Sequence, residues 1–301
     1  MAGKRKVEEY ISYLRYEKRY SQHTLVAYQG DLNQFRAYLG DRYHVEDWKD
    51  VKMLHLRSWI YDLTGQDLEK TTINRKITTL RSFYQFLKKE GFVTSNPVLS
   101  LRSMRTSKHL PEVIPEASIK TYFQMSDQDN WKDKRDRLLI GLLYETGMRR
   151  AELMELKWQE VNVNAGYILV TGKRQKQRQI PLRTQLAQQL RDFRESTHDH
   201  LSKWTEYVMV NDRGDKVYPK WIYNKVRSVL SLWATSEKIS PHTLRHSIAT
   251  HLLDAGADIQ IIRELLGHSS LAATEIYTHN SIEKLKQSYK KALPDLDADF
   301  H

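Results

Sequence analysis

The stretch SPHTLRHSIATHLLDAG, residues 240–256, carries the clearest helix start in the chain. Ser240 is a favoured N-cap residue and Pro241 suits the first helical position, so we expect a helix to begin here. His242 and Arg245 are three positions apart, which places both side chains on one face of the first turn. The unpaired N–H groups and the dipole of that turn favour an anion. The stretch therefore predicts a helix start that can bind phosphate.

Length and composition exclude several classes of protein. The 301 residues leave room for about two domains. The 48 Lys and Arg against 37 Asp and Glu give a net charge of +11, which favours a polyanionic partner, with nucleic acid first. The absence of cysteine excludes disulfides, thiol nucleophiles and thiolate metal sites, and it favours a cytoplasmic location. The longest apolar run, residues 138–144, is too short to span a bilayer, so no membrane contact is expected.

Two amphipathic helices are predicted in the N-terminal part. Apolar residues recur every three or four positions over 21–39 and 71–89, the spacing of one helix face. The other faces of the second segment are basic and hydroxylic. The aromatic residues expected in the core are Tyr28, Phe35, Phe83 and Tyr84. The polar residues that we take as candidate DNA contacts are Gln22, Thr24, Asn74, Lys76 and Arg81.

The helical pattern stops between the two halves of the chain. The segment from Asn96 to Pro115 contains three prolines and several basic residues without periodicity, which is typical of an extended linker. We expect an N-terminal domain at 1–98, a linker at 99–114 and a larger domain at 115–301. Up to Arg105 the chain carries a net charge of +7, and the longer remainder carries +4, so the smaller part is the more basic. Two basic domains on a linker favour closure around a nucleic-acid duplex.

The larger domain is expected to be mostly helical with a small antiparallel sheet. One helix should start near residues 115–116, a second covers KDKRDRLLIGLLYE (132–145), and a third begins at RRAELMEL (149–156). The strand-like segments YILVT (167–171) and RQIPL (178–182) flank GKRQKQ and predict a β-hairpin. A short strand is possible at 207–210. The basic residues expected at the hairpin tip, which either face solvent or touch phosphate, are Lys173, Arg174, Lys176 and Arg178.

Five motifs in this domain resemble those of a known family. They are TGMRRAEL (146–153), GKRQKQRQIPL (172–182), HTLRHSIATHLLDAG (242–256), LLGHSSL (265–271) and IYTH (276–279). In order and spacing they resemble the motifs of the tyrosine recombinases, the phage-integrase family, and most closely its Xer branch. The resemblance covers nearly the whole chain. It implies a helical, SAM-like core-binding domain followed by a mostly helical catalytic domain.

The resemblance also implies the active-site residues. In chain order the family positions fall on Arg149, Lys173, His242, Arg245, His268 and Tyr277, with Glu152 as a supporting residue. All six catalytic positions hold the residue type that the family uses.

These residue types suit attack by a phenol on a phosphodiester. The attack builds negative charge on the non-bridging oxygens, which the planar forks of Arg149 and Arg245 can grip, with His268 as a further donor. Tyr277 has a reference pKa of about 10, so His242 is the expected base. Lys173 is the expected proton donor to the leaving 5′ oxygen. The product is a 3′-phosphotyrosine, and because one phosphoester replaces another, neither ATP, a metal nor another cofactor is expected.

Other site types explain these residues less well. His242 and His246 are four apart and could bind zinc with His251 or His268, but no glutamate lies between them and Arg245 would repel the ion. The segment GKR follows a strand as in a P-loop. However, Gly166 and Gly172 enclose five residues instead of four, and Arg174 stands where Ser or Thr should bind magnesium.

Several functions stay open at this point. The resemblance implies a site-specific recombinase that resolves chromosome dimers through a Holliday junction. An integrase of a mobile element, a type IB topoisomerase-like strand transferase and a non-catalytic DNA-binding protein are the alternatives. The implied partners are double-stranded DNA, a homo- or hetero-tetramer with a second recombinase and, in the Xer branch, a DNA translocase. The tail at 281–301, helical to about Leu293 before Pro294, is expected to dock on a neighbouring subunit.

Overall fold

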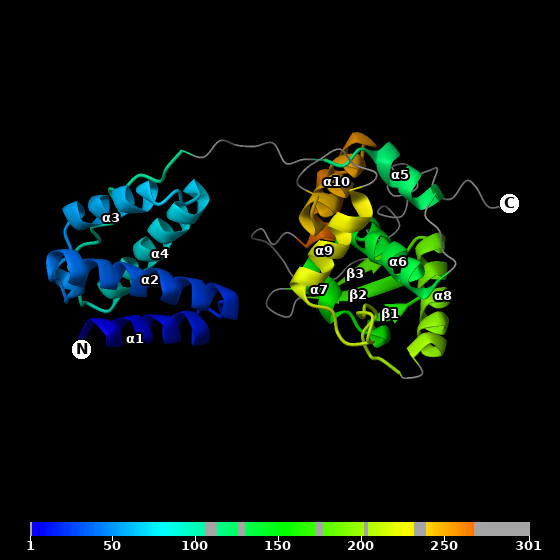
Figure 1. Ribbon diagram of the computed structural model, residues 1–301, viewed down its shortest axis with the longest axis horizontal. Helices are drawn as coiled ribbons and strands as arrows, with labels where there is room; N and C mark the ends of the chain where they lie inside the picture. The colour runs from blue at the N-terminus through cyan, green and yellow to red at the C-terminus, as the bar shows by residue number, and fades with distance from the viewer. Residues whose placement is uncertain are drawn as a thin grey trace. The chain divides into compact units, whose positions relative to one another are not determined.

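The computed structural model describes residues 2–105, 113–125, 130–172, 177–201, 204–231 and 239–267. The chain divides into two compact units, Met1–His109 and Leu110–His301, each with its own core (Figure 1). Val98 and Leu101 are buried in the first unit and Ile114 in the second. Packed chain therefore extends from both sides into the segment expected to be an extended linker.

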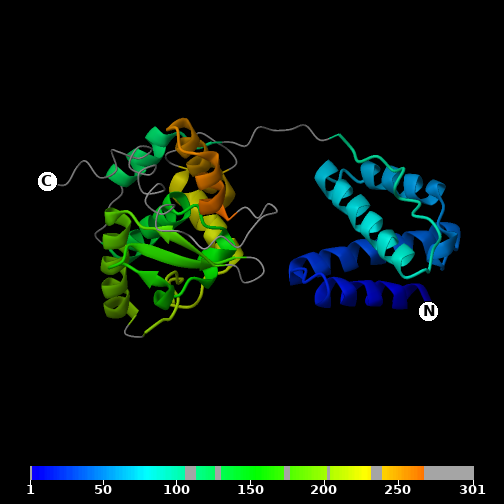
Figure 2. The same cartoon turned by 180° about the vertical axis from the view of Figure 1, so that it is seen from behind.

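The described part of the first unit is helical (Figure 2). Its helices are α1 (Ala2–Tyr16), α2 (Gln22–Tyr43), α3 (Met53–Gly65) and α4 (Lys70–Lys89), with a 3₁₀ turn at Trp48–Asp50. Helix α2 packs against the other three helices. The core holds closely packed rings, with Phe35 and Trp59 at 4.7 Å and Trp48 and Phe83 at 4.8 Å between ring centroids. Phe35, Phe83 and Tyr84 are buried as predicted, whereas Tyr28 is only partly buried.

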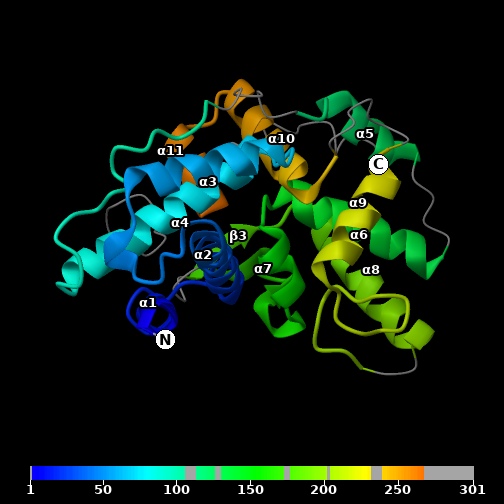
Figure 3. The same cartoon turned by 60° about the vertical axis from the view of Figure 1, so that its left-hand side comes forward.

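Helices also dominate the second unit. They are α5 (Glu116–Met125), α6 (Trp131–Glu145), α7 (Arg150–Glu155), α8 (Thr184–Leu201), α9 (Pro219–Leu230), α10 (Pro241–Asp254) and α11 (Ile259–Leu266). Helix α6 packs against α8, α9 and α10 (Figure 3). Its residues from Arg137 to Glu145 are buried on every face, which makes α6 the centre of this core.

The predicted hairpin is confirmed and belongs to a three-stranded antiparallel sheet. Strands β2 (Tyr167–Thr171) and β3 (Gln177–Pro181) pair with Leu169 opposite Gln179, and the short β1 (Val161–Asn162) adds to β2. The possible strand at 207–210 is instead a loop with isolated bridges to Lys157 and Lys216. The mainly helical fold with a small antiparallel sheet is thus confirmed. No helix of the described residues is long and apolar enough to cross a membrane.

Candidate active site

The start of α10 is built as its sequence predicts. Ser240 is the N-cap, its hydroxyl accepts a hydrogen bond from the backbone N–H of Thr243 at 3.2 Å, and Pro241 is the first helical residue. Both His242 and Arg245 lie in the first turns of this helix. The His242 side chain is exposed to solvent, whereas Arg245 is buried. The first turns of α10 thus carry a buried cation, Arg245, and an exposed titratable ring, His242.

Partial desolvation and positive charge both act on His242. Desolvation of the ring lowers its pKa, and the charges of Arg150, Arg245 and Arg149 lower it further. A histidine with a lowered pKa is neutral at physiological pH, and only the neutral ring can accept a proton. The environment therefore keeps His242 in the form that a general base requires.

The loop between α6 and α7 places Arg149. Gly147 has a φ of +57°, which a residue with a side chain rarely adopts, and a Cβ there would lie 2.7 Å from the side chain of Leu266. Arg149 follows as the N-cap of α7. Its backbone N–H donates to Oε2 of Glu152 at 2.7 Å, and its Nη1 donates to Oε1 of the same carboxylate at 2.7 Å. The first turn of α7 thus fixes one edge of the Arg149 guanidinium.

Glu152 holds a second arginine on its other side. Arg178, on β3, donates from Nη1 to Oε1 at 3.0 Å and from Nη2 to Oε2 at 2.8 Å, a bidentate pair. The Arg178 and Glu152 side chains are 7% and 5% exposed. Burial alone would raise the pKa of Glu152, but the hydrogen bonds and charge of Arg178, and then the hydrogen bonds of Arg149, lower it to about 2. The carboxylate is therefore ionised at neutral pH.

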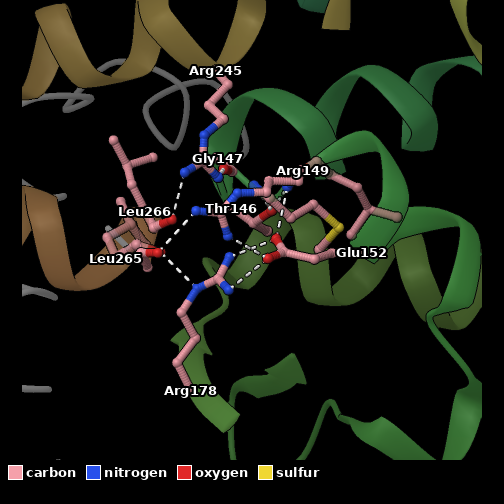
Figure 4. Close-up of polar contacts among 11 residues, drawn as sticks. Thr146, Gly147, Arg149, Glu152, Arg178, Arg245, Leu265 and Leu266 are labelled. Atoms are coloured by element: carbon pink, nitrogen blue, oxygen red, sulfur yellow. Dashed lines mark hydrogen bonds and ion pairs between the residues drawn. The ribbon is translucent and has the colours of Figure 1, made fainter. Parts of the chain in front are cut away.

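Three arginines meet at the C-terminal end of α11 (Figure 4). Arg178 Nε donates to the Leu265 carbonyl at 2.8 Å, Arg245 Nη2 to the Leu266 carbonyl, and Arg149 Nη2 to the Gly267 carbonyl at 2.8 Å. The last carbonyls of a helix lack partners within the helix and carry the negative end of its dipole, so cations are stabilised there. Arg245 Nη1 also donates to the Gly147 carbonyl. One short helix end thus collects side chains from α10, β3 and the α6–α7 loop.

The structure describes some of the predicted site residues and not others. It brings Arg149, Glu152 and Arg245 together and places His242 on the same helix as Arg245. The positions that lie outside the described residues are Lys173, Arg174, Lys176, His268 and Tyr277. Gly267, whose carbonyl accepts from Arg149, directly precedes His268 in the sequence.

The structure corrects the expected position of Arg178. The sequence predicts an exposed residue at a hairpin tip and a candidate DNA contact, but the Arg178 guanidinium is buried against Glu152 and Leu265. The strand pattern holds a signal for this, since Arg178 is two residues before the buried Ile180 and so shares its face of the sheet. What the sequence does not reveal is the carboxylate that makes burial tolerable.

Three of the candidate DNA contacts in the first unit form hydrogen bonds within that unit. Lys76 is buried and donates to Asp31 at 3.0 Å. The Asn74 amide bonds the backbone N–H and carbonyl of Met104, and Arg81 donates to the Leu101 carbonyl at 2.9 Å. Lys76 thus joins α4 to α2 and is buried instead of available to DNA, which corrects its expected position. Asn74 and Arg81 tie the segment after α4 to α4 but are only partly buried, so their contact with DNA stays a prediction.

The other two candidates lie at the start of α2. Gln22 is exposed in its first turn, and the partly buried Thr24 shares a hydrogen bond of 2.9 Å with the Ser21 hydroxyl. Their contact with DNA stays a prediction. Among the histidines of the rejected zinc site, His251 is buried and its Nδ1 lies 2.8 Å from the Tyr144 hydroxyl.

Comparison with known proteins agrees with this geometry. Residues 112–284 match the Phage integrase family, and residues 7–91 match the N-terminal SAM-like domain of phage integrases. The chain belongs to the phage integrase family of tyrosine recombinases. It is 35% identical over 292 residues to the tyrosine recombinase XerC of Lacticaseibacillus casei, covering 96% of this chain and 98% of that protein. It is 33% identical to XerC of Oceanobacillus iheyensis, with 96% and 95% coverage.

Solved structures show the same fold. The recombinase XerH bound to its palindromic difH substrate, a post-cleavage complex, aligns with a TM-score of 0.70 at 22% identity, over 94% of this chain and 83% of that one. A λ integrase tetramer bound to a Holliday junction aligns with a TM-score of 0.65 at 19% identity, over 90% and 80%. As a tyrosine recombinase, the chain is an enzyme that cleaves and rejoins DNA.

Proposed function

We propose that this recombinase acts at one defined DNA site, through a 3′-phosphotyrosine and a Holliday junction, to resolve chromosome dimers in the cytoplasm. The observation that carries the proposal is the convergence of Arg149 and Arg245 on one helix end, beside an ionised Glu152. Near-full-length similarity to XerC proteins supports the Xer assignment over that of a mobile-element integrase.

In this proposal the two arginines bind the scissile phosphate. A guanidinium has five N–H donors. In the described part of the chain, two donors of Arg149 reach Glu152 and Gly267, and two donors of Arg245 reach Gly147 and Leu266. We assign the remaining donors of each fork to the non-bridging oxygens. Because the protein already holds both forks, they need little reorganisation as charge develops in the transition state.

The remaining roles rest on the family motifs. Tyr277 attacks the phosphorus, and the exposed His242 accepts its proton. His268 donates to a non-bridging oxygen, and Lys173 protonates the 5′ oxygen that leaves. Every step is a proton transfer or a phosphoryl exchange, so the bond energy is kept in the phosphotyrosine and the reaction can reverse.

The proposed assembly is a tetramer on two DNA duplexes. The first unit is the core-binding domain and, with the second, binds one duplex. The tail at 281–301 docks on a neighbouring subunit, which is either a second copy or a related recombinase, and a DNA translocase is a further partner. The XerH and λ integrase complexes support DNA binding and multimeric assembly as properties of proteins with this fold.

A nicked duplex that carries the recombination site tests the reaction. Cleavage near the nick releases a short strand, so the covalent protein–DNA adduct accumulates and can be counted on a denaturing gel. We expect the unaltered protein to form the adduct and Tyr277→Phe to form none while keeping its affinity for the duplex. An adduct in Tyr277→Phe would mean that another residue is the nucleophile. Relaxation of supercoiled DNA of arbitrary sequence, without strand exchange, would instead indicate a topoisomerase.

A further inference from the structure

Arg178 contacts both groups that orient Arg149. Its Nη1 donates to Glu152 Oε1, the same oxygen that accepts from Arg149 Nη1. Its guanidinium also lies beneath Gly267, where a Cβ would be 3.0 Å from Nη1 and 3.3 Å from Cζ. The Gly267 carbonyl is the acceptor of Arg149 Nη2. Both groups that accept hydrogen bonds from the Arg149 side chain, Glu152 and Gly267, therefore contact the buried Arg178 side chain.

Arg178 makes more hydrogen bonds than neutralising the charge of Glu152 would require. All three of its nitrogens donate, to Leu265 through Nε and to both oxygens of Glu152 through the Nη atoms. Burying a charged pair costs several kcal/mol in desolvation, and apolar side chains of similar size commonly stabilise a protein as well or better. A rigid, planar fork that joins a strand, a helix start and a helix end is suited to fixing directions.

We propose that Arg178 is a positioning residue for Arg149, acting through the Glu152 carboxylate and the end of α11. It does not contact the DNA phosphate. Without it, the described partners that hold the Glu152 carboxylate are the backbone N–H and the Nη1 of Arg149 itself. The carboxylate can then tilt with Arg149, which turns that fork away from the phosphate. The inference rests on the proposed phosphate-binding role of Arg149.

The consequence is a slow chemical step with nearly normal DNA binding. A misplacement of about 1 Å at a reacting group can slow a reaction about 100-fold. We therefore expect Arg178→Met to form the adduct about 100-fold more slowly at saturating protein. Arg178→Lys keeps the charge but not the fork, so we expect a loss of about 10-fold. In both variants the Kd for the duplex should change by less than about 3-fold, because the other phosphate contacts remain.

The experiment measures single-turnover adduct formation on the nicked duplex, Kd by gel shift and thermal unfolding for each variant. The matched control is Arg135→Met. Arg135 is also a buried arginine, and it pairs with Asp136 and Asp212 away from this site. We expect Arg135→Met to lower the unfolding temperature without slowing cleavage below that temperature. An equal slowing in Arg135→Met would mean that any lost buried arginine has this effect, which overturns the proposal.

Glu152→Gln provides the second control, because Arg178 is proposed to act through Glu152. The double variant Arg178→Met with Glu152→Gln should be about as slow as the slower single variant, and multiplied losses would contradict the shared path. In Arg178→Met the pKa of Glu152 should rise, so its cleavage rate should show a second acidic decline besides the one expected from His242, and Arg178→Lys should show this second decline only weakly.

Two outcomes separate this inference from the proposed function. Adduct formation at the normal rate in both Arg178 variants would overturn the positioning role and leave the recombinase function intact. Failure of the unaltered protein to form any adduct on its site would overturn the function itself.

Discussion

In the described part of each unit a buried carboxylate accepts hydrogen bonds from more than one basic side chain, and the two clusters differ in the net charge that remains. In the first unit Asp31 accepts from Arg75, Lys76 and Thr79, all on α4. In the second unit Glu152 accepts from Arg149 and Arg178, which come from a helix start and a strand. Asp31 joins two helices, α2 and α4, whereas Glu152 joins the start of a helix to a strand of the sheet.

The charge balance of the clusters separates their roles. Lys76 is buried and donates to Asp31 and Gln34. The Arg75 side chain is 40% exposed, so solvent screens its charge. In the second cluster Arg149 and Arg178 share the Glu152 carboxylate, and these two arginines together with Arg245 donate to four backbone carbonyls. Carbonyl dipoles hold the direction of a cation but do not cancel its charge. The second cluster therefore keeps a positive surplus that an incoming phosphate can neutralise, while the first is organised for helix packing.

The largest expected effect is on the cleavage rate, when one of the two phosphate-binding arginines is removed. Arg149→Ala should slow adduct formation by about 100- to 1000-fold, because one preorganised donor group to the phosphate is lost. The measurement is the single-turnover rate on the nicked duplex, with Arg191→Ala, an exposed arginine on α8, as the control. A rate within a few-fold of normal would mean that Arg149 does not take part in the reaction. The proposed difference between the Asp31 and Glu152 clusters would then be wrong.

The next effect falls on stability. Asp31→Ala leaves Lys76 buried without its carboxylate, so the free energy of unfolding should drop by about 3 kcal/mol. Urea unfolding measures this change, and Asp62→Ala, which removes a surface partner of Arg42, should leave the urea midpoint nearly unchanged. The cleavage rate of folded Asp31→Ala at saturating DNA should stay normal. A slowed chemical step with unchanged stability would mean that the first cluster also serves the active site.

The smallest effect is a shift in pH dependence. The pKa of His242 is lowered by desolvation and by nearby arginines, so its neutral form persists below the usual value of about 6.5. The cleavage rate should therefore be flat from about pH 7 upward and should fall only on acidification past that value. His242→Gln should be slower and lack this acidic decline. A decline centred above pH 7 would contradict the sign of the shift.

The sequence predicted those parts of the fold that depend on local signals. The start of α10 follows from Ser240 and Pro241, and the hairpin follows from two β-rich runs around a glycine. Helices α1 and α3 were missed although α1 buries Val7, Tyr10, Ile11 and Leu14 at helical spacing. Their charged neighbours dilute the pattern, and the packing partners on α2 and α4 that decide the outcome are distant in sequence.

The candidate site shows the same division. Motif spacing selected Arg149, Glu152 and Arg245, which the structure brings together. It could not show that Arg178 is buried, because a basic residue next to a hairpin tip is normally exposed and only the tertiary position of Glu152 compensates its charge. The roles of Lys173, His268 and Tyr277 stay predictions from the motifs.

A structure of Tyr277→Phe bound to its intact duplex tests the central claim directly, namely that Glu152 and the end of α11 hold two arginine forks ready for one phosphate. We predict that Arg149 and Arg245 each donate to the scissile phosphate while keeping their bonds to Gly267 and Leu266, with Arg178 still paired to Glu152. A scissile phosphate bound away from these forks, or an Arg178 that leaves Glu152 to reach the DNA, would contradict the account.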